Sequence, residues 1–154
     1  MHLGNLVSLM PMFHLARHGI KPILLLGTAT GLVGDPSGTS SDRIAMERKV
    51  VERNAEKISA QVRNLFAKNG GMELKVVKNH EWYENINIIS FLSEIGKLVR
   101  INPMLSKDSV KTRMDRCDGI NFAEFSYQLL QGYDFYHLFK EFNCKIQVLS
   151  LSSF

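Results

Sequence analysis

Four polar side chains recur every three or four residues in an apolar, aromatic segment predicted to be a helix over 122–142: Glu124, Tyr127, Gln131 and Asp134. Residues at this spacing lie on one face of a helix. A polar stripe of this kind faces either water or a buried polar ligand, and the spacing alone leaves both interpretations open. As a pocket wall, the stripe would offer the hydroxyl of Tyr127, the amide of Gln131 and the carboxylate of Asp134.

A second candidate is the glycine-rich segment Leu24–Gly38, LLLGTATGLVGDPSG. An apolar run that ends in glycine is typical of a buried parallel strand, and ligands of open α/β sheets bind beyond the carboxyl ends of such strands. Asp35 is its one ionised group and is suited to a cationic group such as an ammonium. The alternative is a tight strand-to-helix connection in which Asp35 makes a local Asx turn.

The N-terminus supplies a third candidate, because His2 and Asn5 are three residues apart and share one face of a first helical turn. Free backbone N–H groups and the positive end of the helix dipole make such a turn suited to phosphate. In the alternative interpretation, Asn5 only caps the helix and His2 belongs to a frayed end.

The hydrophobic periodicity and the turn signals predict the elements that must position these residues. We expect Pro11 to kink or end the first helix, and Asn102-Pro103 to break the helix predicted over Ile88–Val99. Alternating strands and helices indicate an α/β domain with a mainly parallel sheet. The predicted elements are a helix over Leu3–His18, a strand over Lys21–Gly27, a helix from caps at Thr39–Asp42 to about Lys68, a strand over Leu74–Val77, helices over Ile88–Val99, Ser106–Met114 (capped by Ser106) and Phe122–Phe142, and a strand over Cys144–Leu149.

Composition sets broad limits on the function. The 154 residues carry a net charge of +4, too weak a bias to indicate nucleic-acid binding by itself. Cys117 and Cys144 form neither a metal-binding spacing nor a disulfide framework, so a reduced compartment is expected. No apolar run approaches the ~20 residues that span a bilayer, and we expect no membrane partner and no targeting segment in this chain.

Several motifs together resemble one family. His2–Asn5, HLGN, resembles the His-Ile-Gly-His signature of class I aminoacyl-tRNA synthetases. Gly27–Gly38 resembles the GGATGLIGDPSG stretch of tyrosyl-tRNA synthetases, and Phe122–Phe135 resembles their FTEFSYNLLQGYDF helix. Asn79 and Trp82 resemble an Asn-x-x-Trp element between them. The order and spacing agree to about Gln147, and the motifs point to the tyrosine enzymes.

The resemblance implies a Rossmann-like parallel sheet with helices on both faces, truncated at both ends. It also implies a two-step reaction: the carboxylate of L-tyrosine attacks the α-phosphate of ATP, and the tyrosyl group then passes to tRNATyr. ATP would be a substrate, with Mg²⁺, and no bound organic cofactor is expected. Because the substrate itself attacks, catalysis would consist of positioning and of stabilising charge on phosphate.

The resemblance also assigns roles to individual residues. A basic companion of Arg43 in the bacterial pattern is replaced here by Thr39. Asn79 matches a position that supports the nucleotide side indirectly. The implied roles are catalysis by His2 and Asn5; ATP binding by His2, Gly4, Asn5 and Arg43; binding of the tyrosine ammonium by Asp35, Tyr127 and Gln131; recognition of the tyrosine phenol by Asp134; and a further tyrosine-pocket contact by Gln147. No metal-ligating residues are implied.

Departures from the family pattern indicate a partial catalytic domain over residues 1–154. A strand before His2, the Gly-Gly-Ser-Asp-Gln stretch after Gln147, a Lys-Met-Ser-Lys-Ser-type loop and the anticodon-binding domain are missing. We therefore expect this chain to lack full aminoacylation activity. A non-catalytic binding or dimerisation module derived from such an enzyme is the alternative.

The resemblance also bears on assembly and compartment. The region of about 83–125 corresponds to an inserted, dimer-forming segment, so a homodimer is expected for the intact enzyme. Phe13-His14-Leu15 and the run Tyr136–Phe139 resemble mitochondrial members more than bacterial ones. The expected compartment is the mitochondrial matrix or the cytoplasm.

Overall fold

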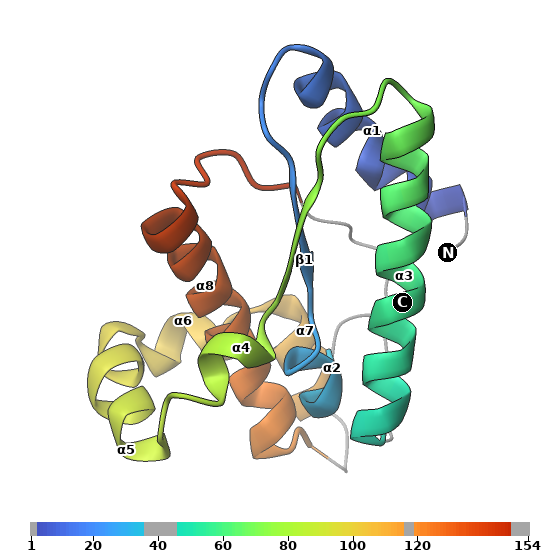
Figure 1. Ribbon diagram of the computed structural model, residues 1–154. Helices are drawn as coiled ribbons and strands as arrows, with labels where there is room; N and C mark the ends of the chain where they lie inside the picture. The colour runs from blue at the N-terminus through green and yellow to red at the C-terminus, as the bar shows by residue number, and fades with distance from the viewer. Residues whose placement is uncertain (1–2, 36–45, 116–118, 149–154) are drawn as a thin grey trace.

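A computed structural model of the chain describes residues 3–35, 46–115 and 119–148 (Figure 1). Helices predominate, and the described part contains one pair of strands. In chain order the elements are α1 Leu3–Arg17, β1 Ile23–Leu26, α2 Thr30–Val33, α3 Arg48–Lys68, β2 Lys75–Lys78, α4 His80–Tyr83, α5 Ile88–Ser90, the π-helical turn η1 Phe91–Ile95, the 3₁₀ turn η2 Gly96–Leu98, α6 Ile101–Leu105, α7 Asp108–Met114 and α8 Phe122–Phe142.

β1 and β2 form a parallel pair in which Ile23 lies opposite Lys75 and Leu26 lies opposite Lys78. Helix α3 falls between them in the chain, and a parallel pair requires a crossover connection of this kind. Each strand begins and ends within two residues of its predicted bounds. The mixed helix-and-sheet class with a parallel sheet is therefore confirmed.

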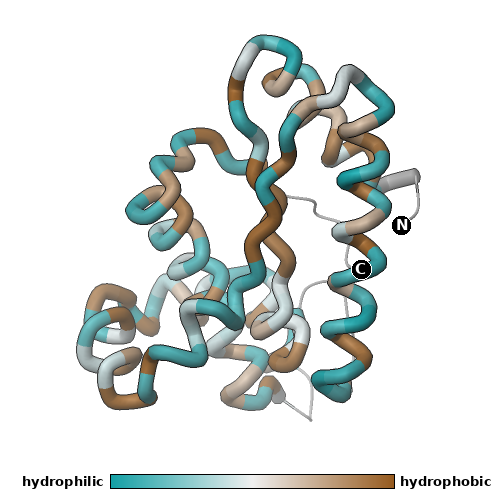
Figure 2. Tube along the Cα trace, viewed as in Figure 1, coloured by the Kyte–Doolittle hydropathy of each residue, from teal (hydrophilic) through white to brown (hydrophobic). Residues whose placement is uncertain are grey.

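Helices pack on both sides of the strand pair (Figure 1). On one side, Leu24 and Val76 pack against a cluster from α1, α3 and Leu74. On the other side, Ile23 and Leu25 pack against a cluster that contains β2 residue Val77, α4 and α8. Alternate strand residues thus enter opposite cores, which explains why all of β1 (ILLL) and the centre of β2 (KVVK) are hydrophobic (Figure 2). The two clusters consist of Leu9, Phe13, Val62, Phe66 and Leu74, and of Val77, Trp82 and Leu138.

Helix α1 is continuous past Pro11, so of the two outcomes predicted, a kink or an end of the helix, the end is excluded. Leu9 before the proline and Phe13 after it are both buried in the same cluster against α3. The ring of Phe13 stacks on Phe66 with centroids 4.2 Å apart. Packing on both sides of Pro11 therefore outweighs the loss of one helical hydrogen bond.

Helix α3 begins at Arg48, later than the caps at 39–42 predicted. Those cap residues lie outside the described residues. Glu47 has an extended backbone, with φ −63° and ψ 141°, so the helix cannot extend back through it. The helix ends at Lys68, as predicted, and Gly70 and Gly71 follow with positive φ.

The segment 88–98 is helical but is not the regular amphipathic α-helix that was predicted. Asn87 caps α5 through a bond from the Ser90 N–H to its Oδ1, and π-helical and 3₁₀ turns follow. The apolar side chains of this segment do not form a core, because Ile89 is 71% and Leu98 is 75% exposed.

Two predicted helix boundaries near residue 103 are wrong. Asn102-Pro103 does not end the preceding helical segment, which ends at Leu98, but lies inside α6. Pro103 is tolerated there because it occupies the first turn, where helical N–H groups have no intrahelical partner. Ser106 does not cap the next helix. Its hydroxyl donates to Pro103 O at 2.9 Å, and α7 begins at Asp108 after Lys107.

The described residues 144–148 of the predicted third strand form no strand. A strand needs a neighbour whose backbone groups complete the ladder. The Cys144 N–H instead donates to Leu138 O at 3.1 Å, which closes the end of α8. Asn143 adopts the left-handed conformation there, with φ 51°, and redirects the chain.

Candidate functional site

Helix α8 carries the candidate site, and its observed bounds are those that the sequence predicted. Asn121 caps it, because its Oδ1 accepts from the Glu124 N–H at 3.0 Å. Helix α2 packs against α8, so the glycine-rich segment after β1 lies beside the polar stripe.

The polar stripe of α8 faces the interior of the molecule. Glu124 and Asp134 are buried, with 2% and 4% exposed, and Tyr127 and Gln131 are half-buried. The first and last residues of the stripe, Glu124 and Asp134, therefore do not face solvent.

Glu124 forms a buried ion pair with Arg113 of α7. Its Oε2 lies 2.9 Å from Arg113 Nη1, and the two side chains are 2% and 3% exposed. Arg113 Nη2 also donates to Gly119 O at 3.4 Å. The pair ties α7 and the turn at Gly119 to the first turn of α8, so it has a structural role rather than lining an open pocket.

Asp134 accepts three hydrogen bonds from one short segment that follows β2. Its Oδ2 accepts from Asn79 Nδ2 at 3.0 Å, and its Oδ1 accepts from Trp82 Nε1 and from the Tyr83 hydroxyl, each at 2.9 Å. Burial raises the pKa of Asp134 above its usual range, and these hydrogen bonds, together with nearby His137, oppose that increase. The site therefore holds a desolvated carboxylate in a fixed orientation.

Asn79 joins this carboxylate to the segment after β1. It is 0% exposed. Its Oδ1 accepts from the Ala29 N–H at 2.7 Å, and its Nδ2 also donates to Thr30 Oγ1 at 3.1 Å. Thr28 Oγ1 lies 2.7 Å from His80 Nδ1. The ends of both strands and α8 therefore meet in one hydrogen-bonded network, which lies on the Asp134 side of the candidate site.

The glycine-rich segment forms a tight turn into α2. A side chain at Gly27 would collide with Thr30 Oγ1, the atom to which Asn79 donates. Gly34 ends α2 with φ 88°, a conformation that favours glycine, and half-buried Asp35 follows it. Asp35 therefore lies in the chain directly after the helix that packs on α8.

The remaining predicted site residues are not part of the described hydrogen-bonded network around Asp134. Asn5 is buried in the first turns of α1, and Gly4 lies in the same helix. Gln147 is exposed, and its Nε2 donates to Phe135 O at 3.0 Å. His2 and Arg43 lie outside the described residues.

Sequence reasoning missed Thr28, Thr30, His80 and Tyr83. Their only signal is position, since each follows the end of a predicted strand. About fifty residues separate the partners of these bonds in the chain. Spacing rules within one element cannot detect such pairs.

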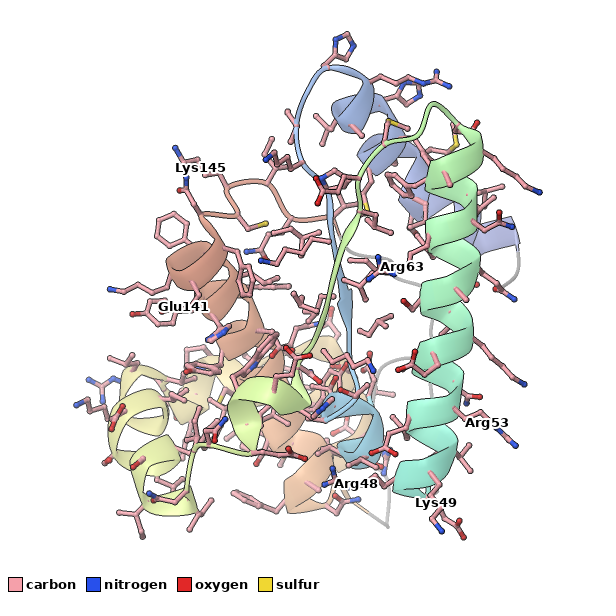
Figure 3. The ribbon with its side chains drawn as sticks, viewed as in Figure 1. Arg48, Lys49, Arg53, Arg63, Glu141 and Lys145 are labelled. Carbon is pink, nitrogen blue, oxygen red and sulfur yellow. The ribbon has the colours of Figure 1, made fainter. Side chains whose placement is uncertain are left out.

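A shallow groove of mixed charge lies next to this network. Its lining residues are Lys49, Glu52, Arg53 and Glu56 from α3, Lys78 from β2, and His80. Figure 3 shows Lys49 and Arg53 extending from the N-terminal half of α3, and Lys78 forms an ion pair with Glu56. Among the described residues no cluster of His, Cys, Asp or Glu is suited to a metal ion, and no described helix is long and apolar enough to cross a membrane.

The chain matches the family model described as tRNA synthetases class I (W and Y) over residues 1–148. It is 41% identical over 149 residues to the tyrosine–tRNA ligase of Protochlamydia amoebophila, covering 96% of this chain and 35% of that protein. It is 43% identical over 148 residues to tyrosine–tRNA ligase 2 of Bacillus anthracis, with the same coverage of 96% and 35%. The chain thus spans about a third of the length of these curated relatives.

Solved structures agree with this match. A C-terminally truncated mitochondrial tyrosyl-tRNA synthetase of Aspergillus nidulans aligns with a TM-score of 0.72 and 33% identity, over 92% of this chain and 42% of that one. The corresponding Coccidioides posadasii structure aligns with a TM-score of 0.73 and 25% identity, over 92% and 40%. The resemblance to tyrosyl-tRNA synthetases is confirmed, and the match over residues 1–148 shows that this chain belongs to the family of class I tRNA synthetases for tryptophan and tyrosine.

Proposed function

We propose that this chain forms part of the catalytic region of a tyrosine–tRNA ligase, which activates L-tyrosine with ATP and transfers the tyrosyl group to tRNATyr. The observation that carries the proposal is the buried Asp134 carboxylate, held by three donors where both strands end. Ligands of open α/β sheets bind at this edge. The relatives described above are named as tyrosine enzymes, which supports the same assignment.

Asp134 would accept a hydrogen bond from the phenol of tyrosine. A buried acceptor that is built for a hydroxyl is left without its partner when phenylalanine enters. Sites of this kind reject the analogue that lacks the hydroxyl by factors on the order of 10⁴–10⁵. The burial of Asp134 supports this role, because the same group in water would discriminate weakly.

The ammonium of the bound tyrosine would be held by Asp35, Tyr127 and Gln131. Tyr127 and Gln131 precede Asp134 on the same face of α8, and Asp35 follows α2, which packs on α8. Gln147 would add a contact at the pocket edge. Its exposed position at Phe135 supports only a peripheral role.

ATP, taken up as its Mg²⁺ complex, would bind at the N-terminal end of α1. His2, Gly4, Asn5 and Arg43 are the proposed contacts, by resemblance to the family. A helix N-terminus presents free N–H groups and partial positive charge, which stabilise phosphate. With the tyrosine carboxylate aimed at the α-phosphate, no protein nucleophile is needed. The protein would position the reactants and stabilise the charge that develops on phosphate.

We further propose that β1 and β2 belong to a Rossmann-like sheet and that residues 1–154 form part of its catalytic domain. Helices on both sides of the strand pair support the first point. The region of about 83–125 would be the inserted, dimer-forming segment. Its exposed apolar side chains, such as Ile88, Ile89 and Leu98, support a homodimer. They also favour the alternative function of a non-catalytic dimerisation module.

The proposed compartment is the mitochondrial matrix or the cytoplasm. Structural similarity to two fungal mitochondrial enzymes supports the first of these. Tagged full-length protein in cells, located against a mitochondrial marker, would decide between them.

The test of the proposed function is tyrosine-dependent ATP–pyrophosphate exchange by the purified chain. Asp134→Asn should lower exchange, on the order of 10- to 100-fold, because it removes a hydrogen bond to a charged acceptor. Asp115→Asn is the matched control, since Asp115 is an exposed carboxylate at the end of α7 and should leave exchange unchanged.

The outcomes separate the two candidate functions. Exchange that Asp134→Asn lowers supports a tyrosine-activating enzyme. A folded chain that binds tyrosine through Asp134 without exchange supports the binding module. A folded chain that neither exchanges nor binds tyrosine contradicts both assignments of the Asp134 site.

A further inference from the structure

Tyr83 belongs to the hydrogen-bonded network around Asp134, but none of the sequence motifs gives it a role. It ends α4 and is half-buried, with its ring 5.8 Å from that of Tyr133 and 6.2 Å from that of Trp82. Its hydroxyl oxygen lies 2.9 Å from Asp134 Oδ1 and 2.7 Å from Leu130 O. Burial and the neighbouring Asp134 raise the pKa of Tyr83 far above its usual range, so the phenol keeps its proton.

One phenolic hydrogen therefore faces two acceptors. Leu130 O lies within α8, where it also accepts the helical bond from the Asp134 N–H four residues later. The ionised Asp134 carboxylate is the stronger acceptor, because hydrogen bonds to a charged group are about twice as strong as neutral ones. The hydrogen should therefore point to Asp134 when that group is ionised, and turn to Leu130 O when it is protonated.

A count of lone pairs on Asp134 leads to the inference. A carboxylate offers about four acceptor positions, two on each oxygen. Trp82 and Tyr83 fill both positions on Oδ1, and Asn79 fills one on Oδ2. Among the described residues, one position on Oδ2 is left.

We propose that Tyr83 is a positioning residue that occupies the second acceptor site of Asp134 Oδ1 and so directs the phenol of a bound tyrosine to Oδ2. This inference rests on the proposed function, since it concerns the tyrosine-binding role of Asp134. Without the Tyr83 hydroxyl, the carboxylate would have two open positions and a weaker preference for its ionised form. Both changes would reduce the fit to one phenol orientation.

The single tryptophan of the chain provides a direct probe. Trp82 Nε1–H donates to the same oxygen as Tyr83, so its indole NMR signal reports on the charge of Asp134. The groups that face Asp134 are Asn79, Trp82 and Tyr83 from the segment after β2, and Tyr133 and His137 from α8. His137 stacks on Trp82 with ring centroids 4.3 Å apart, so its imidazole also contributes to the indole signal. The titrations are therefore done in a His137→Gln background.

Tyr83→Phe should move the midpoint of the indole titration to higher pH, because it removes a donor that favours the charged carboxylate. The matched control is Tyr133→Phe, which removes the same atom from the adjacent ring, and Tyr133 has no described hydrogen bond to Asp134. A midpoint that stays in place in folded Tyr83→Phe, or moves equally in both variants, overturns the inference.

Binding measurements form the second arm, with L-tyrosine and L-phenylalanine as ligands of the full chain with His137 intact. Tyr83→Phe should weaken tyrosine binding about tenfold, as expected for the loss of one hydrogen bond to a charged group, and leave phenylalanine binding unchanged. If the parent chain binds no tyrosine, the proposed function fails while the titration still tests the Tyr83–Asp134 bond. If the parent chain binds tyrosine, and Tyr83→Phe has the same titration midpoint and the same tyrosine affinity, only the Tyr83 inference fails.

A measurement without a variant covers the case in which Tyr83→Phe does not fold. In wild-type protein labelled at the tyrosine ring carbons, the Cζ signal of Tyr83 should follow the Asp134 titration as its hydrogen turns toward Leu130 O. The Cζ signal of Tyr136, whose side chain is exposed, should not follow it. A Tyr83 signal that is flat through the Asp134 midpoint contradicts the inference.

Discussion

At the scale of the residue, burying the Asp134 carboxylate costs desolvation free energy. A carboxylate that is 4% exposed loses most of its hydration, and three donors return only part of it. This is why the pKa of Asp134 remains above its usual range although every described partner favours the charged form. The cost is consistent with a group kept for binding rather than for stability.

A pH-dependent contribution to stability follows at this residue. Because burial raises the pKa of Asp134 in the native state, the stability contributed by its protonated form is present below the unfolded value of 3.8 and is lost as pH rises through the native value. We expect the free energy of unfolding of the parent chain, relative to that of Asp134→Asn, to fall over that window. Urea denaturation at a series of pH values, followed by circular dichroism, measures it. A difference that rises with pH would contradict the prediction.

At the scale of the element, α8 is fixed at both ends of its polar stripe. Arg113 holds Glu124 at the first turn, and the segment after β2 holds Asp134 further along the helix. Tyr127 and Gln131 lie between these two anchors. The register of the whole helix against the rest of the molecule therefore depends on buried polar contacts as well as on the apolar residue Leu138.

Removing one partner of the buried pair should loosen α8. Glu124→Gln leaves Arg113 charged and buried, which costs about 3–5 kcal/mol of the free energy of unfolding. Glu84→Gln is the control, because the Arg48–Glu84 pair is more than half exposed (56% and 54%) and should contribute less than about 1 kcal/mol. Chemical denaturation measures both.

The double variant Arg113→Met with Glu124→Leu gives an additional check on that prediction. It replaces the ion pair with apolar groups and should lose less stability than Glu124→Gln alone. Equal small losses for Glu124→Gln and Glu84→Gln would show that the buried pair does not anchor α8.

At the scale of the whole molecule, the segment 88–105 stands out because many of its apolar side chains are exposed to solvent. Exposed hydrophobic side chains follow one another through it: Ile88, Ile89, Leu92, Leu98, Val99, Ile101 and Leu105. Figure 2 shows hydrophobic stretches recurring along α5 and α6, away from the strand pair. Exposed apolar side chains that gather in one segment are typical of interaction sites in soluble proteins.

We expect the chain to self-associate through this segment. Ile89→Asp should raise the dimer dissociation constant at least tenfold, a change of about 1.4 kcal/mol, because it places a charge in an apolar interface. Sedimentation velocity over a concentration series measures the effect. Val7→Asp alters a similarly exposed apolar residue on α1 and should leave the constant unchanged. Equal effects of the two substitutions would assign the interface elsewhere.

Hydrophobic periodicity and turn residues correctly predicted those parts of the fold that depend on the sequence of a single helix or strand. The bounds of α8, the end of α3 and the positions of the two strands follow from runs of apolar residues and from turn residues such as Gly70 and Gly71. Two of the errors occur where the tertiary surroundings outweigh a local signal. Packing against Phe66 keeps α1 continuous through Pro11, and 144–148 has no neighbouring strand in the described part.

For the candidate site too, some features follow from the sequence of one helix and others only from tertiary packing. The sequence by itself determined that Glu124, Tyr127, Gln131 and Asp134 share a helix face, since helical geometry depends only on spacing. Only the tertiary structure decided that this face is buried and that Asn79, Trp82 and Tyr83 bind Asp134. The physical reason is that hydrogen bonds between segments some fifty residues apart arise when the strands pair and α8 packs on them, and no local pattern records which donors then meet which acceptor.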